Sequence, residues 1–267
     1  MTIGFIGGGN MAEAIISGLL QPKNTTQKII VSEPFAERRN FLKEKFKNIH
    51  LVTDNSEVFN ALPKAIILAV KPQVFPELLK EIAPYSTNRI LISIAAGVTL
   101  QTIKKECPDA KLVRVMPNTP FLALVGCGGI TFDPNINLQE KNMVIDIFKN
   151  SGDLIEMPEK KMHAVTAISG SGPAYFFYFT EELIKAGIAA GLSPEESKTL
   201  ASKTLFGAGT LLMESQDSAE TLRKKVTSPK GTTEAAINSF ISNHFGDTIN
   251  QAVKAAIKRR QELAGEI

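Results

Sequence analysis

A glycine-rich segment near the start of the chain has the composition and spacing of a phosphate-binding turn. Gly7–Ala12 reads GGGNMA, which fits GxGxxA, and it lies between the apolar run Ile3–Ile6 and the helical stretch Glu13–Leu20. In a strand–turn–helix unit the first glycine permits the tight turn, the second admits a pyrophosphate, and the small third residue keeps the helix close to the sheet. The helix N-terminus then attracts the phosphates. The spacing predicts a dinucleotide site, with a purely structural glycine turn as the alternative.

Further candidates follow later apolar runs, where ligands of open α/β sheets collect. Glu33 ends the second run and suits the ribose hydroxyls, with a solvated strand end as the alternative; Asn55, Lys71 and Ala95–Gly97 follow other runs and could equally be plain loop residues. The residues predicted to contact the dinucleotide in these segments are Ile6, Gly7, Gly8, Gly9, Asn10, Met11, Ala12, Glu33, Asn55, Ala69, Val70, Lys71, Pro72, Ala95, Ala96 and Gly97.

The charge of Glu33 also predicts which dinucleotide is preferred. A carboxylate there repels the 2′-phosphate of NADPH and therefore favours NADH. Arg38 and Arg39 follow closely and could instead reach that phosphate, but we interpret them as a solvated helix face.

Three more segments concentrate hydroxyl groups, glycine and proline: Arg114–Pro120, Ser169–Tyr175 and Ser228–Thr233. The second and third come directly before helical stretches, so their N–H groups and hydroxyls could bind an anion at a helix N-terminus. Ordinary helix capping is the alternative for either segment taken alone.

The elements that must position these segments change character near residue 160. Apolar β-branched runs alternate with amphipathic stretches before it, which predicts a parallel sheet covered by helices on both faces. Helical signals dominate after it, such as the capping sequence Ser193–Glu196 behind Gly191. We therefore predict a dinucleotide-binding domain over 1–160 and an all-helical domain over 161–267. The expected strands are Ile3–Ile6, Lys28–Ser32, Ala65–Ala69, Ile90–Ser93, Lys111–Met116 and Gly128–Phe132.

Composition excludes several classes of protein. The 267 residues carry a net charge of +3 from 30 basic and 27 acidic side chains without a basic block, so nucleic acid is not an expected partner. Cys107 and Cys127 are too few for a disulfide framework, and the three histidines show no metal-ligand spacing, so no metal is expected. No apolar run is long enough for a membrane span, and the glycine-rich start does not read as a signal peptide. A cytoplasmic location is expected.

Six segments occur in the order in which a known family has them, between residues 4 and 237: GFIGGGNMAEAI, AVKPQ, SIAAGVT, VRVMPNTP, AISGSGPAY and SPKGTTEAAI. Together they resemble the successive signatures of pyrroline-5-carboxylate reductases. The resemblance implies an N-terminal Rossmann domain with a doubly wound parallel sheet and a C-terminal all-helical dimerisation domain. It also implies NAD(P)H-dependent reduction of 1-pyrroline-5-carboxylate to proline by a homodimer, and it leaves open further assembly of dimers into a ring.

The resemblance assigns roles to matching positions. The segments Met116–Thr119 and Ala69–Pro72 would flank the nicotinamide, and Ser169–Pro173 and Val226–Thr233 would hold the substrate, partly from the partner subunit. The run Arg223–Val226 departs from the family pattern, because relatives often carry an acidic or polar residue before the valine. A side-chain role for Lys224 is therefore in doubt. The implied cofactor contacts are Met116, Pro117, Asn118 and Thr119, and the implied substrate contacts are Ser169, Gly170, Gly172, Pro173, Val226, Ser228, Gly231, Thr232 and Thr233.

The expected chemistry needs orientation more than a strong acid. A protonated imine accepts hydride readily, so the protein mainly has to hold it against the nicotinamide. We expect Thr233 or Ser171 to form a hydrogen bond near the ring nitrogen. Two alternatives stay open: a 3-hydroxyacid dehydrogenase or other imine reductase, which would need Lys185 as general acid, and a non-catalytic dinucleotide sensor.

Overall fold

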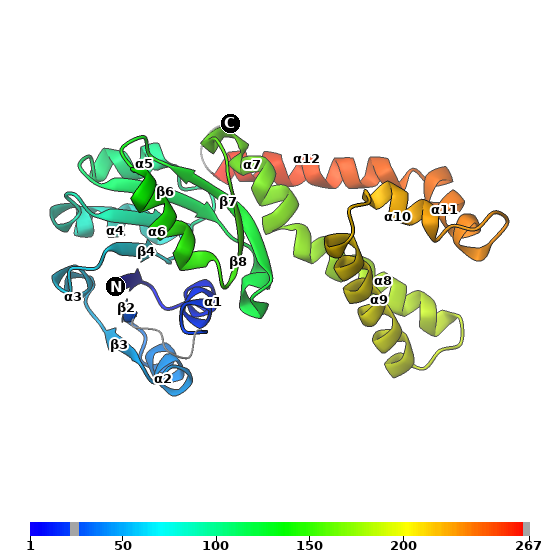
Figure 1. The fold of residues 1–267 in the computed structure, drawn as a ribbon, viewed down its shortest axis with the longest axis horizontal. Helices are drawn as coiled ribbons and strands as arrows, with labels where there is room; N and C mark the ends of the chain where they lie inside the picture. The colour runs from blue at the N-terminus through cyan, green and yellow to red at the C-terminus, as the bar shows by residue number, and fades with distance from the viewer. Residues whose placement is uncertain (22–26, 264–267) are drawn as a thin grey trace. The chain divides into compact units, whose positions relative to one another are not determined.

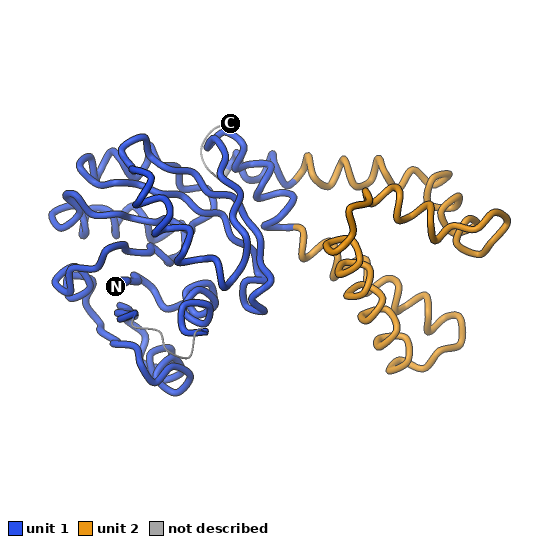
Figure 2. Tube along the Cα trace, viewed as in Figure 1, with its two compact units in different colours: residues 1–171, 256–267 blue, residues 172–255 orange. Residues whose placement is uncertain are grey.

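The computed structural model describes residues 1–21 and 27–263, which fold into two compact units (Figure 2). Residues 1–171 and 256–267 form the first unit, and residues 172–255 form the second. The first unit therefore includes residues 161–171 and the C-terminal segment, both of which the sequence analysis assigned to the second domain. The reason is burial: Met162 and Ala167 are fully buried, and buried Arg260 contacts His163.

Within the described residues, the first unit contains an eight-stranded sheet in the order β3-β2-β1-β4-β5-β6-β7-β8 (Figure 1). Every neighbouring pair is parallel except β6 and β7, which are antiparallel. A parallel pair needs a crossover of about a dozen residues or more, and the segment between these two strands is shorter. The strands are β1 (Thr2–Ile6), β2 (Lys28–Ser32), β3 (Ile49–Val52), β4 (Ala65–Leu68), β5 (Ile90–Ser93), β6 (Lys111–Met116), β7 (Gly126–Phe132) and β8 (Gly152–Glu156).

Two apolar clusters cover the opposite faces of this sheet, which confirms the doubly wound Rossmann architecture. Alternate residues of β4 divide between them, Ile67 facing one cluster and Ile66 the other. The first cluster includes side chains of α1 (Asn10–Leu19), α2 (Ala36–Lys45) and α6 (Leu138–Phe148). The second includes side chains of α3 (Asn55–Asn60), α4 (Phe75–Ile82) and α5 (Leu100–Glu106). The short helix α7 (Met162–Val165) follows the sheet.

The second unit is helical, as predicted. Its helices are α8 (Gly172–Ala189), α9 (Pro194–Glu214), α10 (Ala219–Lys225), α11 (Thr232–Ser242) and the first part of α12 (Phe245–Leu263). Ser193 and Glu196 form the predicted capping box at α9, behind Gly191 in a left-handed conformation at φ +100°. A Cβ on Gly187 would lie 2.3 Å from Ser197 Oγ, so this glycine allows α8 and α9 to pack closely.

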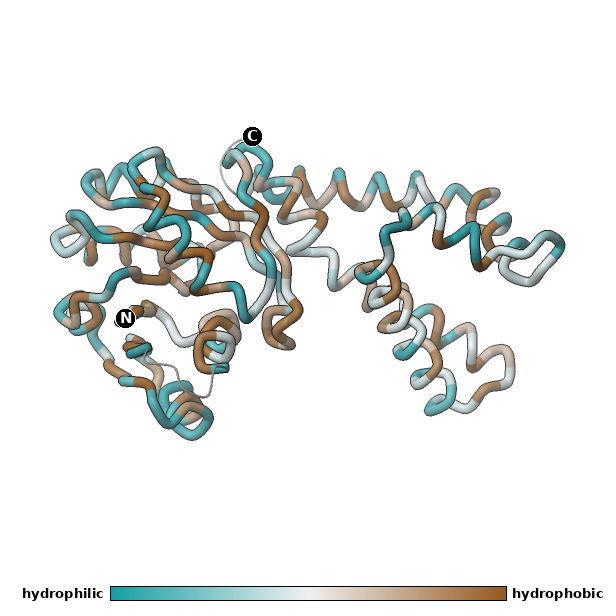
Figure 3. Tube along the Cα trace, in the orientation of Figure 1, coloured by the Kyte–Doolittle hydropathy of each residue, from teal (hydrophilic) through white to brown (hydrophobic). Residues whose placement is uncertain are grey.

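The helices of the second unit leave much of their apolar surface exposed. Ala201 is its one buried hydrophobic residue within the described part of the chain. Hydrophobic stretches recur along these helices in Figure 3, and Phe177, Phe206 and Met213 are 66%, 76% and 81% exposed. None of the described helices is long and apolar enough to cross a membrane.

Candidate active site

The glycine-rich turn leaves the N-terminus of α1 open. Gly7 has φ +93°, and a Cβ there would lie 2.7 Å from the carbonyl oxygen of Ala69. Gly9 is the N-cap of α1 and makes no side-chain capping bond; a Cβ there would meet no described atom within 4 Å beyond its chain neighbours. Ala12 is fully buried in the first cluster. A glycine with open space at a helix N-terminus is the arrangement that a pyrophosphate requires, so these residues fit a dinucleotide.

The central glycine of the turn is held from both sides. Glu33 Oε2 accepts a hydrogen bond from Gly8 N at 2.9 Å, and Arg38 Nε donates to the Gly8 carbonyl at 2.6 Å. Glu33 is 6% exposed, and its other oxygen accepts from Phe35 N at 3.0 Å. The Glu33 carboxylate therefore fixes the turn itself, at the end of β2 where a ribose contact was predicted.

The interpretation of Arg38 and Arg39 as a solvated helix face was wrong. Arg38 also donates to Glu13 Oε2 at 2.6 Å, and Arg39 donates to the carbonyl oxygens of Glu33 and Pro34. Both arginines fold back because carboxylate and carbonyl acceptors lie within reach.

Glu13, a buried residue that sequence reasoning passed over, binds two cations, since Lys45 also donates to it at 2.6 Å. Burial opposes charging of Glu13, but the hydrogen bonds from Lys45 and Arg38 outweigh it and hold its pKa below the usual value. The sequence feature that could have indicated this role is the position of Glu13, an acidic residue in the first turn of the helix that follows the glycines.

Other predicted dinucleotide contacts follow β3, β4 and β5, at the same edge of the parallel sheet as the turn. Asn55 lines a hollow of about 440 Å³ at the ends of β2 and β3, and its Nδ2 donates to Glu81 at 3.0 Å. Lys71 is exposed before a short 3₁₀ turn at Pro72, directly after Ala69 and Val70. Ala95, Ala96 and Gly97 follow β5, with Gly97 at φ +84°.

Two segments far apart in the sequence meet at the end of β6. Asn118 Oδ1 accepts from Cys127 N at 3.0 Å, and its Nδ2 donates to Ser169 Oγ at 3.3 Å. Ser169 Oγ in turn donates to the Cys127 carbonyl at 3.0 Å. A Cβ on Gly170 would lie 2.9 Å from Met116 Cε. The predicted sites Met116–Thr119 and Ser169–Ser171 are thus in direct contact within the first unit.

The remaining predicted substrate residues belong to the second unit. Gly231 is the N-cap of α11, so Thr232 and Thr233 begin its first turn, and Glu234 of the same turn accepts a hydrogen bond from Lys230 N at 2.7 Å. The preceding loop is closed by a bond from Gly231 N to the Ser228 carbonyl at 3.0 Å. Val226 is exposed at the end of α10. Gly172 and Pro173 begin α8 in the same unit.

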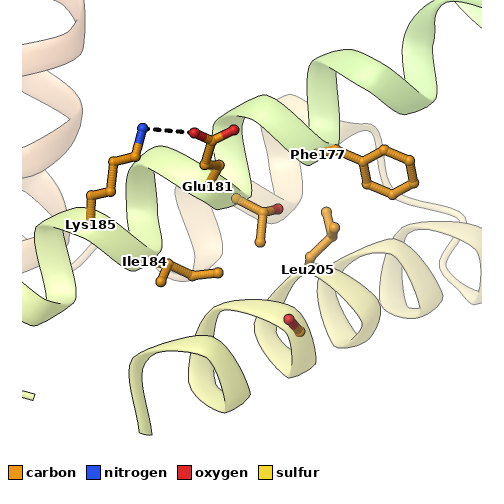
Figure 4. Close-up of a pocket in the computed structure, with 7 residues that line it drawn as sticks. Phe177, Glu181, Ile184, Lys185 and Leu205 are labelled. Atoms are coloured by element: carbon orange, nitrogen blue, oxygen red, sulfur yellow. Dashed lines mark ion pairs between the residues drawn. The ribbon is translucent and has the colours of Figure 1, made fainter. Parts of the chain in front are cut away.

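Lys185, the general acid that the alternative enzyme would need, forms ion pairs with two glutamates. Lys185 and Glu181 line a hollow of about 480 Å³ between α8 and α9, and Lys185 Nζ lies 2.7 Å from Glu181 (Figure 4). Glu182 lies 2.8 Å from the same nitrogen. The hydrogen bonds that Lys185 donates to Glu181 and Glu182 raise its pKa, so it holds its proton and is a poor general acid. Among the described residues, no three potential metal ligands gather.

Comparison with known proteins identifies the family. Residues 159–263 match the family described as pyrroline-5-carboxylate reductase dimerisation, and residues 2–97 match NADP oxidoreductase coenzyme F420-dependent. A pyrroline-5-carboxylate reductase of Synechocystis sp. is 38% identical over 262 residues, which cover 98% of this chain and 97% of the relative. The chain belongs to the pyrroline-5-carboxylate reductase family.

Solved structures of this family share the whole fold. The Coxiella burnetii pyrroline-5-carboxylate reductase superposes with a TM-score of 0.90 at 34% identity over 98% of both chains. The Plasmodium falciparum pyrroline carboxylate reductase, solved with NADP bound, gives 0.86 at 32% identity over 99% of this chain and 98% of the other. Both units therefore have counterparts in pyrroline-5-carboxylate reductases.

Proposed function

We propose that the protein reduces the carbon–nitrogen double bond of 1-pyrroline-5-carboxylate to L-proline, the last step of proline biosynthesis, with NADH or NADPH as hydride donor. The single observation that carries this proposal is that relatives named for this activity match both units over 98% of the chain. The glycine N-caps at Gly9 and Gly231 support it independently, because both ligands are anionic and helix N-termini attract anions.

The first unit would bind the dinucleotide. The N–H groups at the start of α1 would hold the pyrophosphate, and Glu33 would face the adenosine ribose while it fixes Gly8. Ala69–Pro72 and Met116–Thr119 would flank the nicotinamide, which supplies the hydride when bound. The turn at Ser169–Ser171 lies beside Met116, so a substrate there would be next to the reacting ring.

The substrate would be oriented rather than activated by a strong acid. The N–H groups at the start of α11 and the hydroxyls of Ser228 and Thr232 would bind its carboxylate. Thr233 and Ser171 would form hydrogen bonds near the ring nitrogen and fix the face that receives hydride. Lys185 has no part in this scheme, because its glutamate partners keep it protonated.

The assembly would be a homodimer formed through the second unit, with a ring of dimers as a further hypothesis. Support comes from the match of residues 159–263 to a dimerisation family and from the exposed apolar side chains of α8 and α9. A single copy would leave these faces in water, which is costly.

A cytoplasmic location is supported by the two free cysteines, which suit a reducing compartment.

NADH would be the preferred cofactor. Glu33 carries a charge at the ribose position, and Arg38 and Arg39, the cations that could offset a 2′-phosphate, are bonded to protein acceptors. Binding NADPH would require breaking these bonds as well as overcoming the carboxylate.

The proposal is tested by mixing the purified protein with 1-pyrroline-5-carboxylate and NADH or NADPH while the nicotinamide absorbance is followed. Stoichiometric formation of proline is expected. Turnover of 3-hydroxyisobutyrate-type substrates instead would favour the dehydrogenase alternative. Tight dinucleotide binding without turnover of either substrate would indicate a sensor.

A further inference from the structure

We propose that Asn118 is a positioning residue, which fastens the turn before α8 to the end of β6 and thereby sets the position of Ser171. This inference deepens the proposed function and rests on it. It changes the roles of two side chains: Asn118 and Ser169 would act on the substrate through the turn, and not by touching cofactor or substrate.

Both side chains form hydrogen bonds inside the protein. The Asn118 amide accepts from Cys127 N at 3.0 Å, donates to Ser169 Oγ at 3.3 Å and lies 3.4 Å from Cys127 Sγ. Ser169 Oγ donates onward to the Cys127 carbonyl at 3.0 Å. With Asn118 only 6% exposed, this closed set of bonds links three segments: the end of β6, the start of β7 and the turn before α8.

Asn118 directs its amide away from the helix that it begins and toward the turn before α8. Asn118 is the N-cap of a 3₁₀ helix over Thr119–Ala123, where an asparagine side chain commonly caps its own helix. Here it makes no such capping bond and reaches across to Cys127 and Ser169 instead.

The turn that it holds is a π-helical turn between α7 and α8. Thr166–Gly170 forms a π-turn, closed by a bond from Ser171 N to the Thr166 carbonyl at 2.8 Å. Such turns are rare and frequently occur at functional sites. Gly170 lies so close to Met116 that the turn sits directly on the end of β6, and Ser171 follows at once. Loss of the Asn118 bond would remove the side-chain link between this turn and the end of β6, and Ser171 would then be held by its backbone bond to Thr166.

The test compares Asn118→Ala, Ser169→Ala and the double variant of the full-length protein. Each single substitution is expected to raise the KM for 1-pyrroline-5-carboxylate about 10-fold, since each removes hydrogen bonds from the same set. The dissociation constant for NADH, measured by fluorescence titration without substrate, should change by less than about 2-fold. Because the two side chains act as one unit, the KM of the double variant should exceed that of the more impaired single variant by no more than about 2-fold.

Two matched variants isolate the side-chain bonds. Ser169→Thr keeps the hydroxyl and should retain most of the unmodified KM. Cys127→Ala keeps the backbone N–H and carbonyl that Asn118 and Ser169 use and removes only the weak contacts of Cys127 Sγ with Asn118 Nδ2 at 3.4 Å and Ser169 Oγ at 3.2 Å, so it should raise the KM less than Asn118→Ala or Ser169→Ala.

The inference would be overturned if the two single-variant increases in KM multiplied in the double variant. It would also be overturned if the NADH dissociation constant rose in proportion to the KM. Unchanged kinetics in Ser169→Ala, which alters a partly exposed position, would overturn it even if Asn118→Ala fails to fold. Failure of the unmodified protein to reduce 1-pyrroline-5-carboxylate would instead contradict the proposed function.

Discussion

The two units differ in where they find their core. The first buries apolar side chains on both faces of one sheet, whereas the second buries Ala201 and exposes Phe206 and Met213 among its described residues. The first unit can thus hold its glycine-rich turn rigidly by its own packing. The second has helices but needs another surface to cover them. Cofactor binding should therefore depend on one chain, and substrate binding on an assembly of chains.

Assembly through the second unit should respond most strongly to substitution. Phe206 and Met213 lie two turns apart on one face of α9. Phe206→Glu should turn a dimer into a monomer, because burying an unpaired carboxylate costs about 3 kcal/mol or more, or about 100-fold in dissociation constant. Analytical ultracentrifugation measures this, with Phe206→Leu as the control that stays dimeric. An unmodified protein that is monomeric at micromolar concentration would contradict the assembly.

Two neighbouring glycines sharpen the account of the first unit. Gly9→Val should abolish NADH binding and leave the melting temperature nearly unchanged, because only the ligand would meet the new side chain. Gly7→Ala should lower the melting temperature, because its positive φ and the Ala69 carbonyl disfavour a Cβ. Calorimetry and fluorescence titration separate the two results. Tight NADH binding by folded Gly9→Val would remove the turn from the cofactor site.

Thr233 separates the roles of the two units. Thr233→Ala should lower turnover of 1-pyrroline-5-carboxylate roughly 10- to 150-fold, the value of a hydrogen bond to a charged group, while NADH binding stays unchanged. Thr233→Ser retains the hydroxyl and should retain most of the activity. Steady-state kinetics with a parallel NADH titration provide the measurement. Unaltered turnover in Thr233→Ala would exclude Thr233 from the substrate site.

A smaller effect concerns cofactor choice within the first unit. The charge of Glu33 should favour NADH over NADPH by about 5- to 30-fold after screening by solvent and salt. Glu33→Ser should shift this ratio toward NADPH. Glu33→Gln is the sharper control, because its amide oxygen can still accept from Gly8 N without the charge. An unmodified enzyme that prefers NADPH, or a ratio that neither variant moves, would count against the ribose assignment.

The smallest effect is a pH dependence of stability. Since Glu13 has a lowered pKa in the folded protein, its bonds with Lys45 and Arg38 stabilise it at neutral pH and are lost as the pH falls through that lowered pKa. Glu13→Gln should therefore be about 1–2 kcal/mol less stable at pH 7, with the gap closing in acid. Chemical denaturation at several pH values measures the gap. A gap that is constant with pH would assign the loss to packing.

Local patterns predicted what is locally encoded. The turn Gly7–Ala12, most of the alternating strands and the Ser193 capping box depend on residues close in sequence and were predicted, whereas β8 was not among the expected strands. Contacts between distant residues could not be predicted in this way. No residue near Arg38 in the sequence indicates its contact with Glu13, and none near Asn118 indicates its contact with Ser169. The antiparallel β7 likewise depends on how a short connection folds. The list of substrate contacts remains a prediction.

The path of α12 has a consequence for biosynthesis. This helix begins in the second unit and ends in the first, where Arg260 contacts His163. In the order of translation, the helical unit is thus an insertion, made after the whole sheet and before the last segment of the first unit. The sheet can fold while the ribosome is still producing the helices. The contact with His163 closes only after every residue of the inserted unit has been synthesised.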